Sequence, residues 1–509
     1  MNMLLHHLFD QTAARLPGKT ALVCGDQRHR YGQLREQVDQ LAWALQQRGV
    51  QRGDRVALFL DNSVEMVVAI FAVLQAGAVF MPVNPLTKHD KLAYLLNDAR
   101  ASALVTQTSL ASVYQPALTL NQSVHTVFAV GLHEPVDERL VPYASRPSAG
   151  PLWQAPPLID QDLASIIYTS GSTGDPKGVM LSHLNMVSAT RSVSTYLGLL
   201  EDDIILCALP LAFDYGLYQV LMGFAVGATI VLERSFTFPV KVLDVMARER
   251  VTVFPGVPTM FSMLMNLKTL DQHPLASLRM ITNTAAALPE ERIRQLRGLF
   301  PQAQLFSMYG LTECKRVTYL PPDQLDARPT SVGRGMPNEE VWLVDDAGQR
   351  LPNGSTGELV IRGSNVMRGY WEKPLETAKR LKPGPLPGEM LLYSGDLFRT
   401  DAEGYLYFVA RQDDIIKSRG EKVSPREVEN ALYAHDGVYE AAVVGVPDEL
   451  LGQAVKAFVV LKDGITLSER DLVKHCLGRL ESFMAPKHVE FVASLPTTDT
   501  GKIKKTGLN

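Results

Sequence analysis

The sequence is poor in cysteine and has no large excess of either charge. Its 509 residues include four cysteines that stand far apart, with no CxxC pair and no metal-type spacing: Cys24, Cys207, Cys314 and Cys476. Such isolated residues indicate free thiols in a reducing compartment rather than disulfides or a zinc site. Lysine and arginine number 50 against 54 aspartates and glutamates. This balance gives no sign of a basic surface, so we expect no nucleic-acid partner.

The sequence also lacks an uninterrupted apolar segment of membrane-spanning length. The most apolar stretch, residues 66–83, is interrupted by Gly77 and Pro82, whereas a spanning helix needs about 20 apolar residues in a row. The strand-like run VALFL precedes it at residues 56–60. We therefore expect a buried helix over residues 63–75 and a buried strand over 78–83. The N-terminus has no cationic leader, so we expect a soluble, cytoplasmic protein without integral membrane association.

Strand-like runs alternate with helical periodicity along most of the chain. Apolar residues recur at helical spacing over residues 34–45, and the alternation resumes with TIVLER, VTVFPG and LRMIT between residues 229 and 282. Strands that are apolar on both faces and alternate with helices predict an α/β fold with parallel sheets. Residues 331–407 instead contain short runs punctuated by glycine. These predict an antiparallel, β-rich subdomain, for which a barrel is one arrangement.

The pattern changes again near residue 412. A charged segment is followed by a helix that begins at SPREVENAL, the strands YEAAVVGV and AVKAFVVL, and a helix over residues 468–480. We expect a large N-terminal domain, residues 1–412, made of α/β subdomains and the β-rich subdomain. A small α+β domain would follow at residues 413–509. Residues 143–158, rich in Pro, Ser and Gly, predict a surface connection between subdomains.

One short segment, YTSGSTGDPKGVMLSH at residues 168–183, combines hydroxyl residues, glycines and a lysine after the apolar run ASII. Small residues let backbone N–H groups approach phosphate oxygens, hydroxyls donate further hydrogen bonds, and a lysine adds positive charge. The Walker pattern does not match, because Lys177 follows Pro176 and the glycines fall at other spacings. A flexible turn is the structural alternative. We expect the segment to hold the phosphates of ATP.

The same segment resembles the signature of the adenylate-forming superfamily, which includes acyl-CoA synthetases, peptide-synthetase adenylation domains and firefly luciferase. Further motifs of this superfamily follow in order over essentially the whole chain. They are SMYGLTE at 307–313, YSGDLFRTDAEGYLYFVAR at 393–411, DDIIKSRGEKVSPREVE at 413–429 and LPTTDTGKIKK at 495–505. Each alone is weak to moderate evidence, but their order in one chain is specific. The resemblance implies that a carboxylic acid is coupled to ATP and that the acyl group then passes to a thiol.

The resemblance also implies a site for ATP and Mg²⁺. Tyr309 would lie along the adenine, Asp396 would accept the ribose hydroxyls, and Arg411 would lie beside the ribose and phosphate. Thr312 would bond a phosphate oxygen, and Glu313 would help to hold the metal ion. The remaining ATP-binding residues would be those of the glycine-rich loop: Thr169, Ser170, Gly171, Ser172, Thr173, Gly174 and Lys177.

A lysine near the C-terminus is implied as a further catalytic residue. Lys502, in TGKIKK, would reach the substrate carboxylate and the α-phosphate during adenylation. Asp413 would be the hinge about which a mobile small domain swings between adenylation and thiol transfer. Ordinary roles are open as well. Lys502 could be a solvated tail cation, Asp396 could cap a turn, and Glu313 could pair with Lys315.

The identity of the acid depends on PLAFDYGLYQ at residues 210–219. Many acyl-CoA synthetases have histidine near this place, whereas amino-acid adenylation domains have Phe-Asp, whose aspartate binds the substrate ammonium. Asp214 follows the second pattern, and a carboxylate beside a pocket needs a cationic partner. The analogy also implies a small, mostly apolar pocket that suits a compact amino acid such as L-proline, with walls formed by Tyr215, Tyr218, Pro255, Ile281, Asn283, Met308 and Val317. The alternatives are that Asp214 is a helix N-cap and that the substrate is a fatty or aryl acid.

The thiol acceptor stays open between the phosphopantetheine of a carrier protein and that of CoA. Only seven residues follow Lys502, so we expect any carrier to be a separate polypeptide. Lys315 and Arg316 depart from common adenylation domains, and they could face solvent or contact a carrier or an acidic substrate. The complete set of motifs disfavours a catalytically silent homologue, and nothing indicates a luciferase-like oxygenase.

Overall fold

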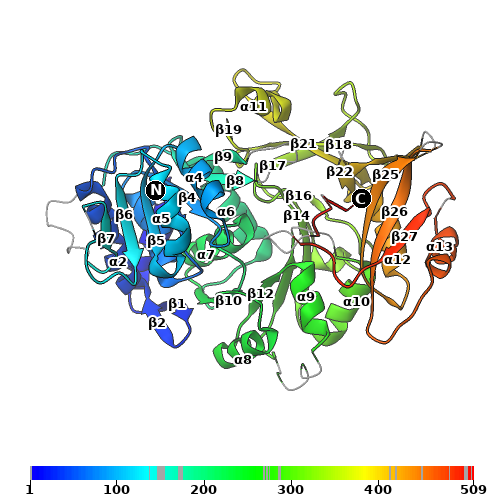
Figure 1. Ribbon diagram of the computed structural model, residues 1–509, viewed down its shortest axis with the longest axis horizontal. Helices are drawn as coiled ribbons and strands as arrows, with labels where there is room; N and C mark the ends of the chain where they lie inside the picture. Colours follow the sequence, from blue (N-terminus) through cyan, green and yellow to red (C-terminus); the bar gives the residue numbers. More distant parts are fainter. Residues whose placement is uncertain are drawn as a thin grey trace.

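The structure is a computed structural model. It describes residues 3–136, 138–145, 155–169, 176–267, 270, 273, 275–284, 288–411, 414–418, 421–448, 451–480, 482–497, 503–505 and 507–508. Figure 1 shows a large body that contains the N-terminus and, at the right of the view, a smaller body formed by the C-terminal part of the chain. The predicted surface connection falls largely outside the described residues, because residues 146–154 are not among them.

The first large sheet has eight strands among the described residues, in the order β19-β9-β8-β4-β3-β5-β6-β7. Its central strands are parallel, and β8 and β9 form an antiparallel pair. The strands are β3 (Arg55–Phe59), β4 (Val79–Val83), β5 (Ala101–Gln107), β6 (Thr126–Val130), β7 (Leu140–Pro142), β8 (Leu163–Thr169), β9 (Lys177–Ser182) and β19 (Gly369–Tyr370). The helices within this part of the chain are α2 (Tyr31–Gln47), α3 (Val64–Gln75), α4 (His89–Asp98), α5 (Ala111–Thr119) and α6 (His183–Leu197).

The second large sheet has nine strands in the part of the chain that the structure describes, in the order β16-β15-β14-β13-β12-β10-β11-β1-β2. It is parallel from β1 to β14 across the sheet, with antiparallel strands at both edges. The strands are β1 (Thr20–Cys24), β2 (Gln27–Arg30), β10 (Ile204–Cys207), β11 (Thr229–Leu232), β12 (Val253–Gly256), β13 (Met280–Asn283), β14 (Gln304–Tyr309), β15 (Thr318–Leu320) and β16 (Arg334–Gly335). The helices are α1 (Leu5–Arg15), α7 (Asp214–Val226), α8 (Pro239–Glu249), α9 (Pro258–Met265) and α10 (Glu290–Leu299). The predicted α/β class is confirmed.

The most apolar stretch of the sequence is buried between elements of the two sheets. It forms α3 and β4, as predicted, and every residue of α3 except Glu65 is buried. The Phe71 ring of α3 lies 5.6 Å from that of Phe224 in α7 and 4.8 Å from that of Phe9 in α1. Packing on all sides explains why α3 has no polar face. In the described part of the chain, no helix has the length and apolar character that crossing a bilayer requires.

The β-rich segment forms a five-stranded antiparallel sheet with the order β17-β18-β21-β20, and β22 pairs with β21. This pairing does not close into a barrel among the described residues. The elements are β17 (Glu339–Val344), β18 (Thr356–Gly363), α11 (Pro374–Arg380), β20 (Leu381–Pro383), β21 (Met390–Thr400) and β22 (Leu406–Arg411). The sheet extends toward the smaller body, which lies beside β22 in Figure 1.

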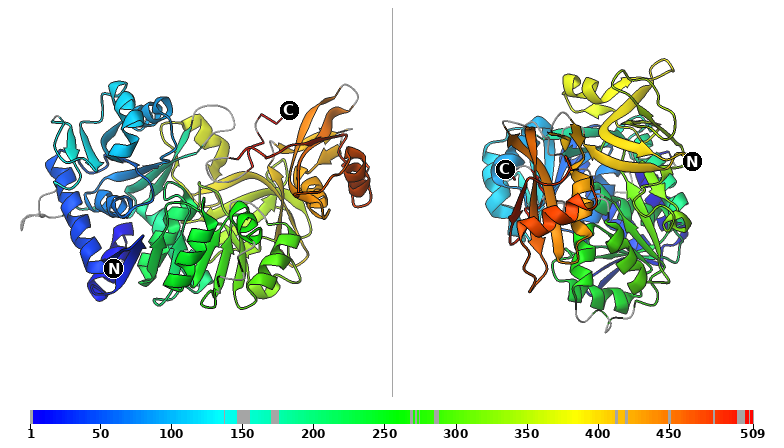
Figure 2. Two further views of the ribbon diagram at one scale, coloured as in Figure 1. Left: turned by 60° about the horizontal axis from the view of Figure 1, so that its bottom comes forward. Right: turned by 90° about the vertical axis from the view of Figure 1, so that its right-hand side faces the viewer.

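The small C-terminal body contains a second five-stranded sheet and the predicted helices, and it projects from the large body in Figure 2. Its elements are β23 (Ile416–Ser418), β24 (Glu421–Val423), α12 (Pro425–Tyr433), β25 (Val438–Asp448), β26 (Gly452–Leu461), α13 (Glu469–Leu477) and β27 (His488–Phe491). Ser424 caps α12 by accepting from Glu427 N, and its Oγ donates to Val409 O of β22 at 2.6 Å. The predicted boundary between residues 412 and 413 lies outside the described residues and stays a prediction.

Candidate functional site

The residues predicted to surround the acid lie at one edge of the nine-stranded sheet. β12, β13 and β14 are parallel, and their register pairs Gly256 with Asn283 and Asn283 with Ser307. Their carboxyl ends therefore meet at the edge where open parallel sheets bind ligands. α7 joins this edge because Tyr215 Oη donates to Thr282 O at 2.7 Å. The predicted wall residues belong to these strands, to α7 or to the loop after β14: Tyr215, Tyr218, Pro255, Ile281, Asn283, Met308 and Val317. Their role in substrate binding stays a prediction.

Tyr309 and Asp396 form the central contact of the predicted nucleotide site. Tyr309 ends β14, and its Oη donates to Asp396 Oδ2 of β21 at 2.5 Å. Arg411, the direct β22 partner of Asp396, places its Nε 4.0 Å from Oδ1. Burial raises the pKa of Asp396, while the hydrogen bond from Tyr309 and the charge of Arg411 oppose that rise. Oδ1 is beyond hydrogen-bond distance of Arg411, which suits an acceptor for a ligand hydroxyl. Asp396 is therefore not a simple turn cap.

Tyr370 connects Glu313 to the predicted phosphate loop. Its Oη donates to Glu313 Oε1 at 2.7 Å, and its ring centre lies 5.6 Å from Lys177 Nζ. Lys177 also forms an ion pair with Glu376 of α11, and the hydrogen bond from Lys177 is the main reason why the pKa of Glu376 is lowered to about 2. The predicted phosphate and metal residues therefore lie next to each other, joined by a tyrosine.

Part of the predicted machinery lies outside the described residues. This part comprises the loop residues Ser170, Gly171, Ser172, Thr173 and Gly174, the hinge residue Asp413 and the catalytic lysine Lys502. Thr169 and Lys177, which flank the loop, are partners at the end of the β8–β9 pair. Thr312 lies in the turn that follows β14. The roles of all these residues stay predictions.

The loop between β14 and β15 holds Lys315 in an unusual backbone conformation. Lys315 has φ of 74°, in the left-handed region that costs energy for a residue with a side chain. Its N–H donates to Leu311 O at 2.7 Å. Its carbonyl packs so closely on Gly310 that a Cβ there would lie 2.0 Å from the oxygen. On the other side, Asn365 Nδ2 donates to Cys314 O at 2.7 Å. The loop is therefore held from both sides.

Lys315 is fully buried and forms an ion pair with Asp214. Its Nζ lies 2.7 Å from Asp214 Oδ1, and its side chain is 0% exposed. Asp214 is the first residue of α7, while the N-cap is Phe213 without a side-chain cap bond, so the N-cap alternative is wrong. The alternative pairing of Glu313 with Lys315 is wrong as well, because each has a different partner. Burial lowers the pKa of Lys315, and Asp214 opposes this effect. The protein itself supplies the cation that Asp214 needs.

Arg316 is a second buried cation in this region. It is 4% exposed, and its guanidinium carbon lies 4.6 Å from the ring centre of Tyr215. Its Nη1 donates to Lys315 O at 3.3 Å, while its buried Nε has no hydrogen-bond partner within the described chain. Neither Lys315 nor Arg316 faces solvent, which excludes one of the roles considered from the sequence.

Sequence reasoning did not identify Tyr370, Asn365 or Glu376 as site residues. Tyr370 and Glu376 belong to GYWEKPLET, in which no spacing distinguishes a functional tyrosine from a core tyrosine. Their position arises from the pairing of β19 with β9. For Lys315 and Arg316 a signal did exist, because they interrupt an otherwise familiar motif.

A magnesium ion would have few protein ligands at this site. Among the described residues, no three His, Cys, Asp or Glu side chains form a metal-binding group. Mg²⁺ at nucleotide sites is usually bound by one or two carboxylates together with substrate phosphates and water. A single carboxylate oriented by a tyrosine, as Glu313 is by Tyr370, fits that arrangement. Its metal role stays a prediction.

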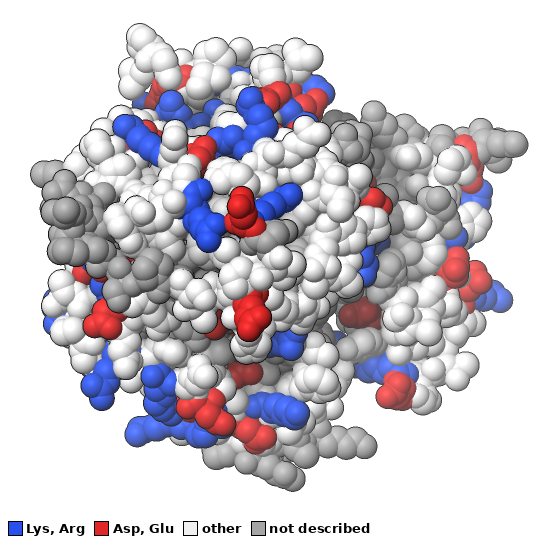
Figure 3. All heavy atoms as spheres, turned by 60° about the vertical axis from the view of Figure 1, so that its left-hand side comes forward, with Lys and Arg blue, Asp and Glu red and all other residues white. Residues whose placement is uncertain are grey.

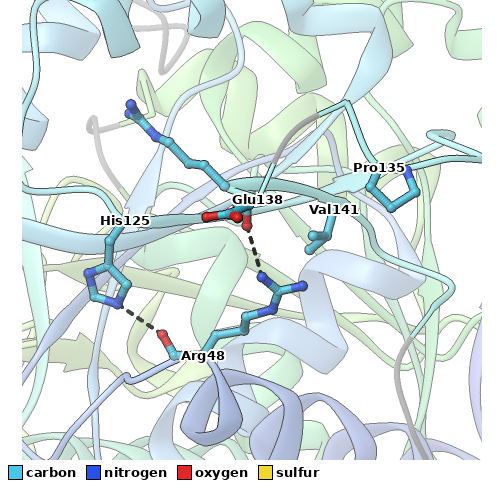
Figure 4. A pocket seen from close by; sticks show the side chains of 6 residues that line it. Arg48, His125, Pro135, Glu138 and Val141 are labelled. Carbon is cyan, nitrogen blue, oxygen red and sulfur yellow. Dashed lines mark hydrogen bonds between the residues drawn. The ribbon is translucent and has the colours of Figure 1, made fainter.

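One surface hollow lies away from these residues, on the N-terminal part of the molecule (Figure 4). Its volume is about 680 Å³, and none of the predicted site residues is among its lining residues. There Arg48 Nη1 donates to Glu138 O at 2.9 Å, and His125 Nε2 lies 3.1 Å from Arg48 O. The face in Figure 3 has small mixed groups of both charges. Neither feature indicates a second site, so we place the candidate site at the strand ends.

Comparison with family models identifies two matching regions. The description "AMP-binding enzyme" matches residues 9–371, and "AMP-binding enzyme C-terminal domain" matches residues 427–502. The two matches together cover most of the chain, and they agree with the order of motifs in the sequence.

Characterised relatives fall into two groups. The chain is 32% identical to the long-chain-fatty-acid–CoA ligase of Bacillus subtilis strain 168, over 100% of this chain and 94% of the relative. It is also 32% identical to tyrocidine synthase 2 of Brevibacillus parabrevis, over 99% of this chain but 14% of that protein. Among solved structures, the anthranilate CoA ligase AuaEII in complex with anthranoyl-AMP matches with a TM-score of 0.90 at 28% identity, covering 99% of this chain and 96% of that one.

Proposed function

The chain belongs to the family of AMP-binding enzymes, and on that premise we propose that it joins a carboxylic acid without an α-amino group to CoA. Enzymes of this family activate an acid with ATP and then form a thioester. The finer choices, of acid and of thiol, are our proposal.

The observation that carries the choice of acid is the buried ion pair between Lys315 and Asp214. An aspartate that binds a substrate ammonium must offer that cation an unpaired carboxylate. Asp214 already has a lysine at 2.7 Å, so an incoming ammonium would meet a neutral pair and the repulsion of Lys315. The pair therefore supports a fatty or aryl acid over an amino acid such as L-proline.

The choice of CoA over a carrier protein rests on similarity. The long-chain-fatty-acid–CoA ligase relatives align over nearly their full length, whereas the peptide-synthetase relative aligns over a small part of its own. A benzoate CoA ligase from Burkholderia xenovorans LB400 is a further structural match, with a TM-score of 0.88 at 28% identity. A carrier-protein thiol is the competing acceptor in the experiment below.

In the proposed reaction, bound ATP supplies the AMP group, and Mg²⁺ offsets the charge of its phosphates. Asp396, held by Tyr309, would orient the ribose, and Lys177 would neutralise phosphate charge. Tyr370 would hold Glu313 toward the metal ion. Lys502 would offset the repulsion between the substrate carboxylate and the α-phosphate.

The test is ATP–pyrophosphate exchange with matched pairs of acids, followed by thioester formation on CoA or on a loaded carrier protein. L-Proline is compared with cyclopentanecarboxylate, and phenylalanine with 3-phenylpropanoate, so that each pair differs by the amino group or its ring equivalent. We expect the acid without the amino group to have the higher kcat/KM in each pair, and CoA to accept the acyl group. Preference for an amino acid, or transfer to the carrier alone, would contradict the proposal.

A further inference from the structure

The predicted acid pocket contains a buried positive charge that the protein does not compensate. Lys315 and Asp214 neutralise each other, but Arg316 forms no ion pair in the described part of the chain, and its Nε has no hydrogen-bond partner there. Arginine cannot shed its charge by losing a proton in a protein. A buried, unpaired guanidinium is unfavourable unless an anion completes the site.

The buried carboxyl group of Glu339 does not serve as the counter-ion of Arg316. Glu339 acts on the same tyrosine as Arg316, Tyr196. However, burial raises the pKa of Glu339 well above its ordinary value, and Asn365 Nδ2 donates to its Oε2 at 2.6 Å. Glu339 thus has Asn365 as its hydrogen-bond partner, and among the described residues it forms no ion pair with Arg316.

Buried hydroxyl groups without partners occur on the elements that carry the predicted acid pocket. Tyr215 and Tyr218 are one helical turn apart on α7; Arg316 stacks on the first and acts electrostatically on the second. The hydroxyls of Tyr218, Thr284 and Thr318 are buried without hydrogen-bond partners in the described residues. They come from α7, from the position after β13 and from the first residue of β15. Buried polar groups normally find partners, and hydroxyls together with a guanidinium form a donor set for an anion.

We propose that the acid substrate has a second anionic group, a second carboxylate in the simplest case, and that Arg316 binds this group in the pocket beside Tyr215 and Tyr218. The inference rests on the proposed function, since it assigns the far end of the same substrate. A guanidinium binds a carboxylate through two parallel N–H···O bonds. A plain fatty or aryl acid would leave Arg316 uncompensated. A substrate ammonium would add a third cation beside Lys315 and Arg316.

The test uses the full-length enzyme with ATP and CoA, and pairs of acids in which one member has a second carboxylate. Hexanoate is compared with adipate, and 3-phenylpropanoate with 3-(4-carboxyphenyl)propanoate. We expect the diacid to have a kcat/KM about 100-fold higher than the monoacid in at least one pair. This factor is of the size that one buried charge pair contributes to binding. Arg316→Met should remove this preference by lowering the kcat/KM for the diacid far more than it changes that for the monoacid. Arg316→Lys should restore part of it.

Two further variants protect the test against misfolding. Arg334→Met removes an exposed arginine that also stacks on a tyrosine, 4.1 Å from the ring centre of Tyr405, and should leave both acids unaffected. Tyr218→Phe removes one hydroxyl and should lower the kcat/KM for the diacid about 10-fold, a larger change than for the monoacid. If monoacids are preferred with CoA and Arg316→Met lowers both acids alike, the second-anion inference is wrong while the proposed function stands. If an amino acid is preferred, both are wrong.

Discussion

At the scale of single residues, this protein is unusual in the charges that it buries beside the predicted acid pocket. Lys315 is fully buried with Asp214 as its ion-pair partner, and Arg316 stacks on Tyr215. Buried charges are costly because they lose their hydration. Removing one partner of a buried pair should therefore lower the free energy of unfolding more than removing one partner of an exposed pair. This asymmetry allows a direct test of the pair.

Asp214→Asn should lower the free energy of unfolding by about 3–5 kcal/mol, because it leaves Lys315 charged and unpaired in the interior. The double variant Asp214→Asn, Lys315→Met should recover most of this loss, since Lys315 then no longer leaves an unpaired charge in the interior. Urea unfolding of both variants measures the difference. A loss below about 1 kcal/mol in the single variant, as for an exposed pair, would show that Lys315 does not depend on Asp214.

The affinity for ATP should depend on the ionisation of Asp396. Burial raises its pKa above the ordinary value, so on acidification the carboxylate takes up its proton at a higher pH than an exposed aspartate does. The KM for ATP should therefore rise as the pH falls through that raised pKa. Tyr309→Phe removes an opposing hydrogen bond and should move the onset to still higher pH. Asp396→Asn should give weak, pH-independent binding, and an unchanged profile in Tyr309→Phe would contradict this role.

The raised pKa of Asp396 affects folding stability in the opposite direction to ATP binding. Between the ordinary and the raised pKa of Asp396, the folded protein binds a proton that the unfolded chain has already lost. The contribution of this group to stability therefore decreases as the pH rises through that window. Function and stability thus place competing demands on one carboxylate.

At the scale of elements, α11 and β9 meet through the ion pair between Glu376 and Lys177. Lys177 cannot serve Glu376 and a phosphate group fully at the same time. Glu376→Gln should release the lysine and lower the KM for ATP by about two- to fivefold, the modest size expected for a pair near the surface. Glu340→Gln, on the exposed part of the β17–β18 sheet, should have no effect. A higher KM in Glu376→Gln would mean that the glutamate positions the lysine.

The β14–β15 loop also depends on one glycine. A Cβ at position 310 would lie 2.0 Å from Lys315 O, so Gly310→Ala should displace the loop and cost about 1–3 kcal/mol of stability. Acid activation should fall as well, because Glu313 and Lys315 belong to this loop. Gly298→Ala in α10 is the control, since a Cβ there meets nothing within 4 Å and alanine favours helix by about 0.5–1 kcal/mol. Thermal unfolding and exchange rates compare the two, and equal behaviour would refute the steric argument.

At the scale of the whole molecule, we predict that the small domain contributes Lys502 to adenylation but not to thiol transfer. If Lys502 neutralises charge during adenylation alone, Lys502→Ala should lower the adenylation rate about 10²–10³-fold. Thiol transfer from supplied acyl-adenylate should change far less, because the domain would by then have swung about Asp413. Rapid-quench measurement of each half-reaction provides the comparison. An equal loss in both would contradict the one-sided role.

The sequence by itself determined the α/β class and the chemistry of acid activation. Both depend on patterns that are local in the chain: strands alternating with helices, and short motifs in which Gly, Ser, Thr and Lys stand together. It also located Tyr309 and Asp396, because each lies in its own recognisable motif, although their hydrogen bond joins β14 to β21.

Only the tertiary structure decided the electrostatics of the acid pocket. Asp214 and Lys315 are 101 residues apart in the chain, and no local pattern relates a helix start to a distant loop. From its neighbours in sequence, Asp214 is predicted to bind a substrate ammonium. In the folded protein it forms an ion pair with Lys315 instead. Burial and pairing are properties of the packed fold, and for buried charges they outweigh residue type in setting what a site can bind.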